Sequence, residues 1–127
     1  ITVVKNGRVI DPYNNIDSKL NIVIKDGKIL ELTPNEISGE KNIDATGLIV
    51  CPGFIDIHMH EDMYHKEEDY LDDGLQNQCL TGVTTCIGGN CGINLTEPLT
   101  YLDAVDRLKL TVNIGLMAGH TNIRELC

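Results

Sequence analysis

Hydrophobic and polar positions alternate in short runs over roughly the first 50 residues. Runs rich in β-branched residues are interrupted by Asn6–Gly7 and Asp26–Gly27, and such dipeptides are typical of two-residue hairpin turns. The pattern predicts one hairpin over 2–10 that turns at Asn6–Gly7, and a second over 21–32 that turns at Asp26–Gly27. We therefore expect a small antiparallel sheet, followed by a polar loop over 33–42.

From about residue 53 the pattern changes to alternating strands and helices. Strand-like runs cover 54–60, 83–88 and 111–117, and the second ends in a glycine-rich turn. A spacing of roughly 30 residues per strand-and-helix unit is typical of parallel strands joined by crossover helices. The sequence thus predicts a parallel sheet, with a loop over 118–121 after the third strand.

Two segments between these strands have helical periodicity. The segment 67–80 repeats apolar positions at intervals of four and is ended by Gly82. Its apolar residues are Leu71, Leu75 and Cys79. The segment 98–108 has Pro98 in its first turn and an apolar stripe at intervals of three. That stripe consists of Leu99, Leu102, Val105 and Leu108.

Composition narrows the class of protein. Hydrophobic residues make up 42% and charged residues 23% of the chain, as in folded globular domains. The net charge of −9 disfavours nucleic acid and anionic membrane surfaces as partners, and no apolar run approaches the roughly 18 residues of a membrane-spanning helix. The five cysteines are odd in number and contain no Cys-x-x-Cys pair, so we expect a reducing cytoplasm.

His58 and His60 are the first candidates for chemistry. Residues two apart in a strand point to one face, so these two imidazoles project together and can chelate a divalent metal. Asp56 shares that face and could orient a ligand histidine or add an oxygen ligand. A His-x-His pair without chemistry is common on exposed strands. However, the end of a buried parallel strand favours a metal site, because parallel barrels place their active sites there.

Cys91, His120 and Arg124 follow the second and third strands. A deprotonated cysteine is a good zinc ligand, and Cys91 lies in the glycine-flanked turn from which its thiol could reach the same centre. A small buried cysteine without chemistry is an equally open interpretation of Cys91. His120 and Arg124 lie on the same side of the sheet, although a loop histidine and a solvent-facing arginine remain the plainer interpretation.

Three segments resemble one family of enzymes. Residues 52–60, PGFIDIHMH, resemble the signature of the amidohydrolase superfamily of metal-dependent barrel hydrolases. Residues 82–92, GVTTCIGGNCG, and residues 112–124, VNIGLMAGHTNIR, resemble the second- and third-strand segments of N-acyl-D-amino-acid deacylases. The Gly-His-Gly segment of that family departs here to Gly-His-Thr, with Thr121 as its last residue. The change puts the geometry of this loop in question and points to a relative with a different substrate.

The resemblance implies a set of site residues. It assigns His58, His60 and Cys91 as ligands of one or two divalent metal ions, with zinc expected. His120 and Arg124 become candidates for substrate binding, and Arg124 is expected to meet a substrate carboxylate. The general acid/base of the family lies on later strands, beyond residue 127. We therefore expect no catalytic residue within this chain.

The resemblance also implies a fold. The expected class is α/β: the N-terminal part of a metal-dependent (β/α)8 (TIM) barrel, preceded by strands of a small β-sandwich ancillary domain. The ancillary part would cover 1–50 and the first barrel strands and helices 51–127. A complete barrel needs about 250 residues. Because the sequence starts at Ile1 rather than Met and stops at Cys127 after a strand-like run, we expect an N-terminal portion of a longer chain.

The expected activity is hydrolysis of the amide bond of small-molecule N-acyl-D-amino acids by a metal-activated water. The fragment alone is expected to be inactive, and its open sheet edge to be covered by the missing C-terminal part or by a homo-oligomer. Alternatives within enzymes are a dihydroorotase-like cyclic amidase and a β-aspartyl dipeptidase. A non-catalytic barrel homologue acting as an assembly module is a further alternative. A free-standing metal-binding domain is disfavoured, since it would leave a parallel sheet edge unpaired.

Overall fold

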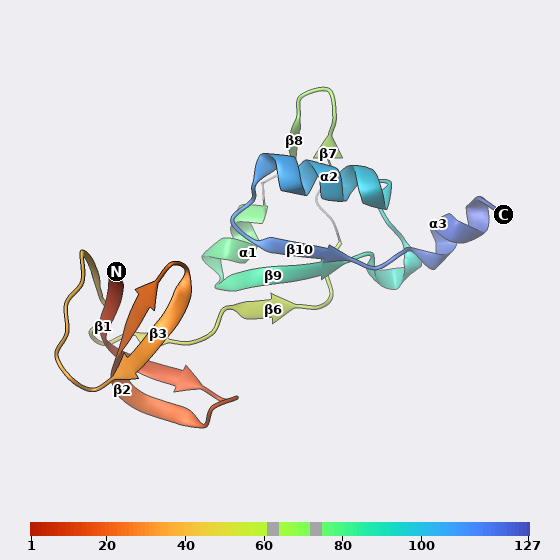
Figure 1. Cartoon of the computed structure of the whole chain (residues 1–127). Coiled ribbons are helices and arrows are strands. Elements are labelled where there is room, and N and C mark those ends of the chain that lie inside the picture. The colour runs from red at the N-terminus through yellow and green to blue at the C-terminus, as the bar shows by residue number, and fades with distance from the viewer. Residues whose placement is uncertain (61–63, 72–74) are drawn as a thin grey trace. The chain divides into compact units, whose positions relative to one another are not determined.

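The structure, a computed structural model, describes residues 1–60, 64–71 and 75–127. The chain divides into two compact units, Ile1–Pro52 and Gly53–Cys127, and the main sheet of each unit is separate (Figure 1). No helix in these described ranges has both the length and the apolar character needed to cross a membrane. The identification of the units with an ancillary domain and a barrel stays a prediction.

The first unit contains a five-stranded mixed sheet in the order β3-β2-β1-β4, with β5 also paired to β1. Its strands are β1 (Thr2–Asp11), β2 (Ile16–Lys25), β3 (Lys28–Thr33), β4 (Lys41–Asp44) and β5 (Ile49–Val50). β2 runs antiparallel to both β1 and β3, whereas β4 and β5 run parallel to β1. The expectation of a purely antiparallel sheet is therefore wrong. After β3, the chain crosses back and pairs β4 and β5 with β1 in the same direction as β1 runs.

The two predicted turns have different outcomes. The hairpin at Asp26–Gly27 is confirmed between β2 and β3, with φ of 51° and 73° at the two turn residues. The hairpin at Asn6–Gly7 is wrong, because β1 continues through this dipeptide and the register shifts there as a β-bulge. The backbone N–H of Asn6 donates to Oδ1 of the buried Asn21 at 2.8 Å, so a side chain satisfies the bulge.

The second unit contains the three-stranded parallel sheet that the sequence predicts. Its order is β10-β9-β6, with β6 (Phe54–Asp56), β9 (Val83–Gly88) and β10 (Asn113–Leu116). The helix α2 (Pro98–Leu108) connects β9 to β10 and packs against β10 (Figure 1). This mixed α/β arrangement brings the carboxyl ends of three strands to one edge of the sheet, while a closed barrel stays a prediction.

The predicted helix over 67–80 is wrong for most of its length. The chain instead forms a short hairpin of β7 (Tyr64–His65) and β8 (Tyr70–Leu71), followed by α1 (Gln76–Leu80). Residues 72–74 of the predicted helix lie outside the described residues. Asp69 has φ of 54° in the hairpin turn, and its carboxylate accepts hydrogen bonds from Arg107 of α2. These contacts favour a hairpin over a helix.

The helix α2 begins with Pro98, as predicted, but its two fully buried residues lie outside the predicted apolar stripe. Tyr101 and Ala104 are fully buried, whereas Leu99 is 70% exposed. The helix begins where the Glu97 carboxylate accepts the backbone N–H groups of Leu99 and Thr100 at 3.1 and 2.7 Å. The backbone N–H of Leu99 therefore takes part in the capping of the first turn, whereas its side chain is not part of the buried face.

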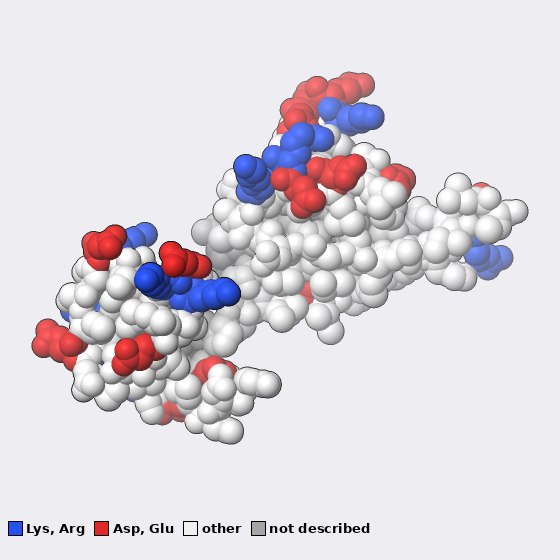
Figure 2. Space-filling model, viewed as in Figure 1, with Lys and Arg blue, Asp and Glu red and all other residues white. Residues whose placement is uncertain are grey.

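The described part of the second unit contains a small cluster of buried apolar residues. It consists of Met59, Leu75, Cys86 and Val112, with Val83, Leu110 and Ile114 packed around it. Cys79, which the predicted helical stripe included, is exposed. The charged side chains of this unit gather around the β7–β8 hairpin and α2 on the face seen in Figure 2, where both signs are interspersed. Arg107 and Asp69 form an ion pair in that group.

Candidate metal centre

His58 and His60 lie just beyond a strand and not on it. The strand β6 ends at Asp56, and both histidines are exposed in the irregular segment that follows. β6 is an edge strand of the described sheet, with Phe54 57% and Ile55 65% exposed. The expectation of a buried strand that carries both histidines is therefore wrong. Pairing with one neighbour leaves one side of β6 open.

Met59 holds the segment between the two histidines in place. Its side chain is only 6% exposed in the core cluster, and its backbone N–H donates to the carbonyl of Ile87 at 3.3 Å. Because Met59 points inward, the flanking histidines stay at the surface. Their ring centroids lie 5.8 Å apart with an interplanar angle of 69°.

Asp56 contacts the backbone of His58. Its Oδ1 accepts the His58 backbone N–H at 3.0 Å, and Asp56 does not belong to the three-residue group of possible metal ligands. The carboxylate thus orders the chain immediately before the first histidine. The predicted role of Asp56 in orienting a ligand histidine stays a prediction, with this backbone contact as its structural basis.

Cys91 projects from a tight turn after β9. The 3-10 turn η2 (Asn90–Gly92) has Cys91 in the left-handed region, with φ of 59° and ψ of 17°. Gly89 and Gly92 on either side also have positive φ, of 76° and 74°. A non-glycine residue in this region costs about 1 kcal/mol. The glycines reduce the strain of the remaining turn, and the turn directs the thiol toward the histidines.

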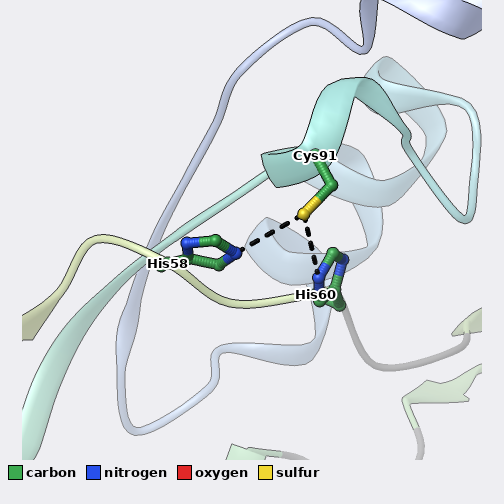
Figure 3. Close-up of side chains that lie close together, drawn as sticks. All are labelled: His58, His60 and Cys91. Atoms are coloured by element: carbon green, nitrogen blue, oxygen red, sulfur yellow. Dashed lines mark hydrogen bonds between the residues drawn. The ribbon is translucent and has the colours of Figure 1, made fainter.

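The three candidate ligands converge although two strands supply them. Sγ of Cys91 lies 3.6 Å from Nε2 of His58 and 3.7 Å from Nε2 of His60 (Figure 3). All three potential ligand atoms lie within 4.8 Å of one another. Typical zinc bonds of about 2.3 Å to sulfur and 2.0–2.1 Å to nitrogen, at tetrahedral angles, separate the two atoms by about 3.6 Å. The spacing therefore fits a zinc ion between them.

The chemistry of the donor atoms restricts which metal ions the site could bind. Two imidazole nitrogens and a thiolate suit zinc and related transition metals, whereas magnesium and calcium prefer oxygen ligands. All three residues are exposed in the part of the chain that the structure describes.

His120 and Arg124 lie on a short helix beside η2. The helix α3 (His120–Glu125) begins where the sequence predicted a loop, so that expectation is wrong for its second half. Thr121 is helical and has no positive φ, so the backbone accommodates a β-branched residue at this position. Both candidates are exposed, and His120 is not in the group of three. Their roles in substrate binding stay predictions.

Two buried asparagines of this region escaped the sequence analysis. The Asn94 side chain accepts the Gly119 N–H at 2.6 Å and donates to the carbonyl of Met117 at 3.1 Å, which ties the loop after β9 to the loop after β10. The Asn90 side chain donates to the backbone carbonyl of Met59, between the two histidines, and to that of Ile87 in β9. Their signal in the sequence was two asparagines beside a glycine-rich turn, which alone does not distinguish a buried amide from an exposed one.

Among known proteins, dihydroorotases are similar to this chain in amino-acid sequence. No protein-family model matches the chain. The chain is 37% identical to a dihydroorotase of Aquifex aeolicus strain VF5 over 117 residues, which cover 90% of this chain and 27% of that protein.

Solved structures resemble the whole described chain. An N-acyl-D-glutamate deacylase of Bordetella bronchiseptica, complexed with zinc and a phosphonate inhibitor, aligns with a TM-score of 0.79 and 25% identity, over 97% of this chain and 30% of that one. A D-aminoacylase variant in complex with CuCl2 aligns with a TM-score of 0.79 and 28% identity, over 98% of this chain and 30% of that one. The chain thus spans less than a third of the length of these proteins.

Proposed function

These relatives and structural neighbours support the amidohydrolase superfamily for this chain, and on that premise we propose that it supplies part of the active site of a metal-dependent hydrolase acting on amide C–N bonds. The observation that carries the proposal is the convergence of His58, His60 and Cys91, whose ligand atoms lie within 4.8 Å of one another.

The residues of this chain would supply three ligands of the metal. His58, His60 and Cys91 bind it, and the Asp56 carboxylate fixes the backbone of His58. When bound, such a metal lowers the pKa of water and polarises a carbonyl group. The cationic, planar fork of Arg124 suits a substrate carboxylate, and His120 lies at the start of the same helix. The general acid/base is proposed to lie outside residues 1–127.

For the substrate we favour an N-acyl-D-amino acid. The two structural neighbours at a TM-score of 0.79 are by name an N-acyl-D-glutamate deacylase and a D-aminoacylase. The resemblance of the Gly-Asn-Cys-Gly turn to the N-acyl-D-amino-acid deacylases implies Cys91 as a ligand. A cyclic amide is the second candidate, supported by 37% identity to a dihydroorotase. Parallel assays of full-length protein on a panel of N-acyl-D-amino acids and on dihydroorotate distinguish the two. Turnover of dihydroorotate alone would contradict the first.

The metal centre has a direct test in the full-length protein. The variants His58→Ala, His60→Ala and Cys91→Ala should each lose bound zinc, measured by elemental analysis, together with amide hydrolysis. Cys79→Ala serves as the matched control, because Cys79 is an exposed free cysteine outside the group of three. Retained zinc and full activity in all three variants would contradict the proposal.

We further propose that β6 is covered in the functional protein. Phe54, Ile55 and Ile57 are 57%, 65% and 72% exposed, more apolar surface than an edge strand ordinarily leaves in water. Further barrel strands of a longer chain, or a second copy of this chain, would cover them. Light scattering on residues 1–127 and on the full-length protein separates these two cases. A stable monomer of residues 1–127 would contradict covering by a second copy, and a full-length protein in which the backbone of β6 exchanges its amide hydrogens freely would contradict covering by later strands.

A further inference from the structure

The side chain of Asn90 connects the turn that carries Cys91 with the segment that carries the two histidines. Asn90 is only 9% exposed. Its Nδ2 donates to the carbonyl of Met59 at 3.3 Å and to the carbonyl of Ile87 at 2.8 Å. Both N–H groups of one amide are thereby directed at backbone acceptors 31 and 3 residues away in the sequence.

The two acceptors of Asn90 are themselves connected. The carbonyl of Ile87 also accepts the backbone N–H of Met59 at 3.3 Å. Met59 is therefore fixed through its N–H, its carbonyl and its buried side chain. The neighbours of Met59 in the sequence are His58 and His60, and the neighbour of Asn90 is Cys91. A shift of this amide would consequently move the thiol relative to both imidazoles.

We propose that Asn90 is a positioning residue that sets the separation between the Cys91 thiol and the His58 and His60 rings before a metal binds. The inference rests on the proposed metal centre and extends it to a residue that contributes no ligand atom. Without the amide, the left-handed Cys91 turn would lose its connection to the histidine segment, and the 3.6 and 3.7 Å separations would no longer be held.

The chemistry of the site requires an amide at position 90. The side chain at this position donates to two carbonyl oxygens at once, and a group with two donors on one planar head can do this. An aspartate has the same shape but places one acceptor oxygen, in the position of Nδ2, against both carbonyls. A serine has one hydroxyl donor and can serve one of them.

Asn94 provides a matched control a few residues away. It is likewise buried, at 5% exposure, and its Nδ2 donates to a backbone carbonyl, that of Met117, at 3.1 Å. This carbonyl lies after β10, not in the histidine segment. Asn94→Asp therefore removes a comparable buried donor without loosening the link between Cys91 and the histidines.

The test is cobalt binding by the full-length protein, prepared free of metal and titrated with Co²⁺. Wild type should show the sulfur-to-cobalt charge-transfer band of a thiolate ligand. Asn90→Asp should weaken Co²⁺ binding by about tenfold or more and alter that band, since groups that orient metal ligands typically contribute 10- to 100-fold to affinity. Asn90→Ser should give an intermediate loss. Asn94→Asp should lower thermal stability while leaving both the affinity and the band unchanged.

The outcomes separate this inference from the proposed function. Wild type with the band, but Asn90→Asp with wild-type affinity and spectrum, would overturn the role of Asn90 and leave the metal centre standing. Wild type without a sulfur-ligated cobalt spectrum would overturn both. If Asn90→Asp does not fold, Asn90→Ser decides, since it keeps one donor: unchanged affinity and spectrum in that variant overturn the inference.

Discussion

Sγ of Cys91 lies 3.6 Å from Nε2 of His58, although 33 residues separate the two in the sequence. The contact exists because β6 and β9 are adjacent and parallel, so their carboxyl ends meet at one edge of the sheet. Each residue lies just beyond its strand, in a segment where side-chain direction depends on local turns. The geometry of the candidate metal centre therefore depends on the contacts that hold these turns.

Met59 is the main apolar support of the histidine segment. Met59→Ala should lower the free energy of unfolding by about 2–5 kcal/mol, because it leaves a cavity among Leu75, Cys86 and Val112. Zinc affinity should fall as well, since both neighbours of Met59 are proposed ligands. Met117→Ala is the control, with a side chain 44% exposed and an expected loss of about 1 kcal/mol or less. Equal losses of stability in urea denaturation would contradict this.

Gly89 combines a positive φ with a lack of space. A Cβ at this position would overlap the carbonyl oxygen of Met117 and lie 2.8 Å from Nδ2 of Asn94. Gly27 has a similar φ of 73°, but nothing lies within 4 Å of its Cβ position. Gly27→Ala should therefore cost about 1 kcal/mol in unfolding free energy, and Gly89→Ala clearly more. Thermal denaturation measures both, and the two variants should differ in this order.

Glu97 is expected to make stability depend on pH. Hydrogen bonds from the backbone and hydroxyl of Thr100, and from the backbone of Leu99, hold the pKa of this carboxyl below its ordinary value. Because its pKa is lowered in the folded state, the ionised Glu97 carboxylate contributes to the free energy of unfolding. This contribution is complete above the ordinary glutamate pKa and is lost as pH falls through the lowered pKa. Wild type should therefore exceed Glu97→Gln in stability at pH 7, and the difference should vanish in acid. A difference that is constant with pH would be contrary to this mechanism.

Arg107 is expected to anchor the β7–β8 hairpin. Its guanidinium donates to the Asp69 carboxylate and to the Tyr64 hydroxyl. The hydrogen bond from Arg107 to the Asp69 carboxylate is the main cause that lowers the pKa of Asp69. Arg107→Ala should speed amide hydrogen exchange over 64–71, and high salt should do so in wild type, because the pair is exposed. Arg8→Ala, which removes the exposed Arg8–Asp17 pair in the other unit, should leave this exchange unchanged.

The sequence predicted some local features correctly because their causes are local. The turn at Asp26–Gly27 and the start of α2 at Pro98 follow from backbone preferences of the residues themselves. The hairpin at Asn6–Gly7 failed because Asn21, on the neighbouring strand, satisfies a bulge at the same dipeptide. The helix over 67–80 failed because Arg107, far along the chain, binds Asp69 in a hairpin turn.

By itself, the sequence determined the residue types of the candidate site and the alternation of strands and helices that brings His58, His60 and Cys91 to the carboxyl ends of parallel strands. Only the tertiary structure decided that the three ligand atoms converge within 4.8 Å. It also decided that the buried amide of Asn90 contacts the segment between the two histidines. The physical reason is that periodicity reports which face of an element is apolar, whereas the direction of a side chain beyond a strand end depends on hydrogen bonds from residues distant in the sequence.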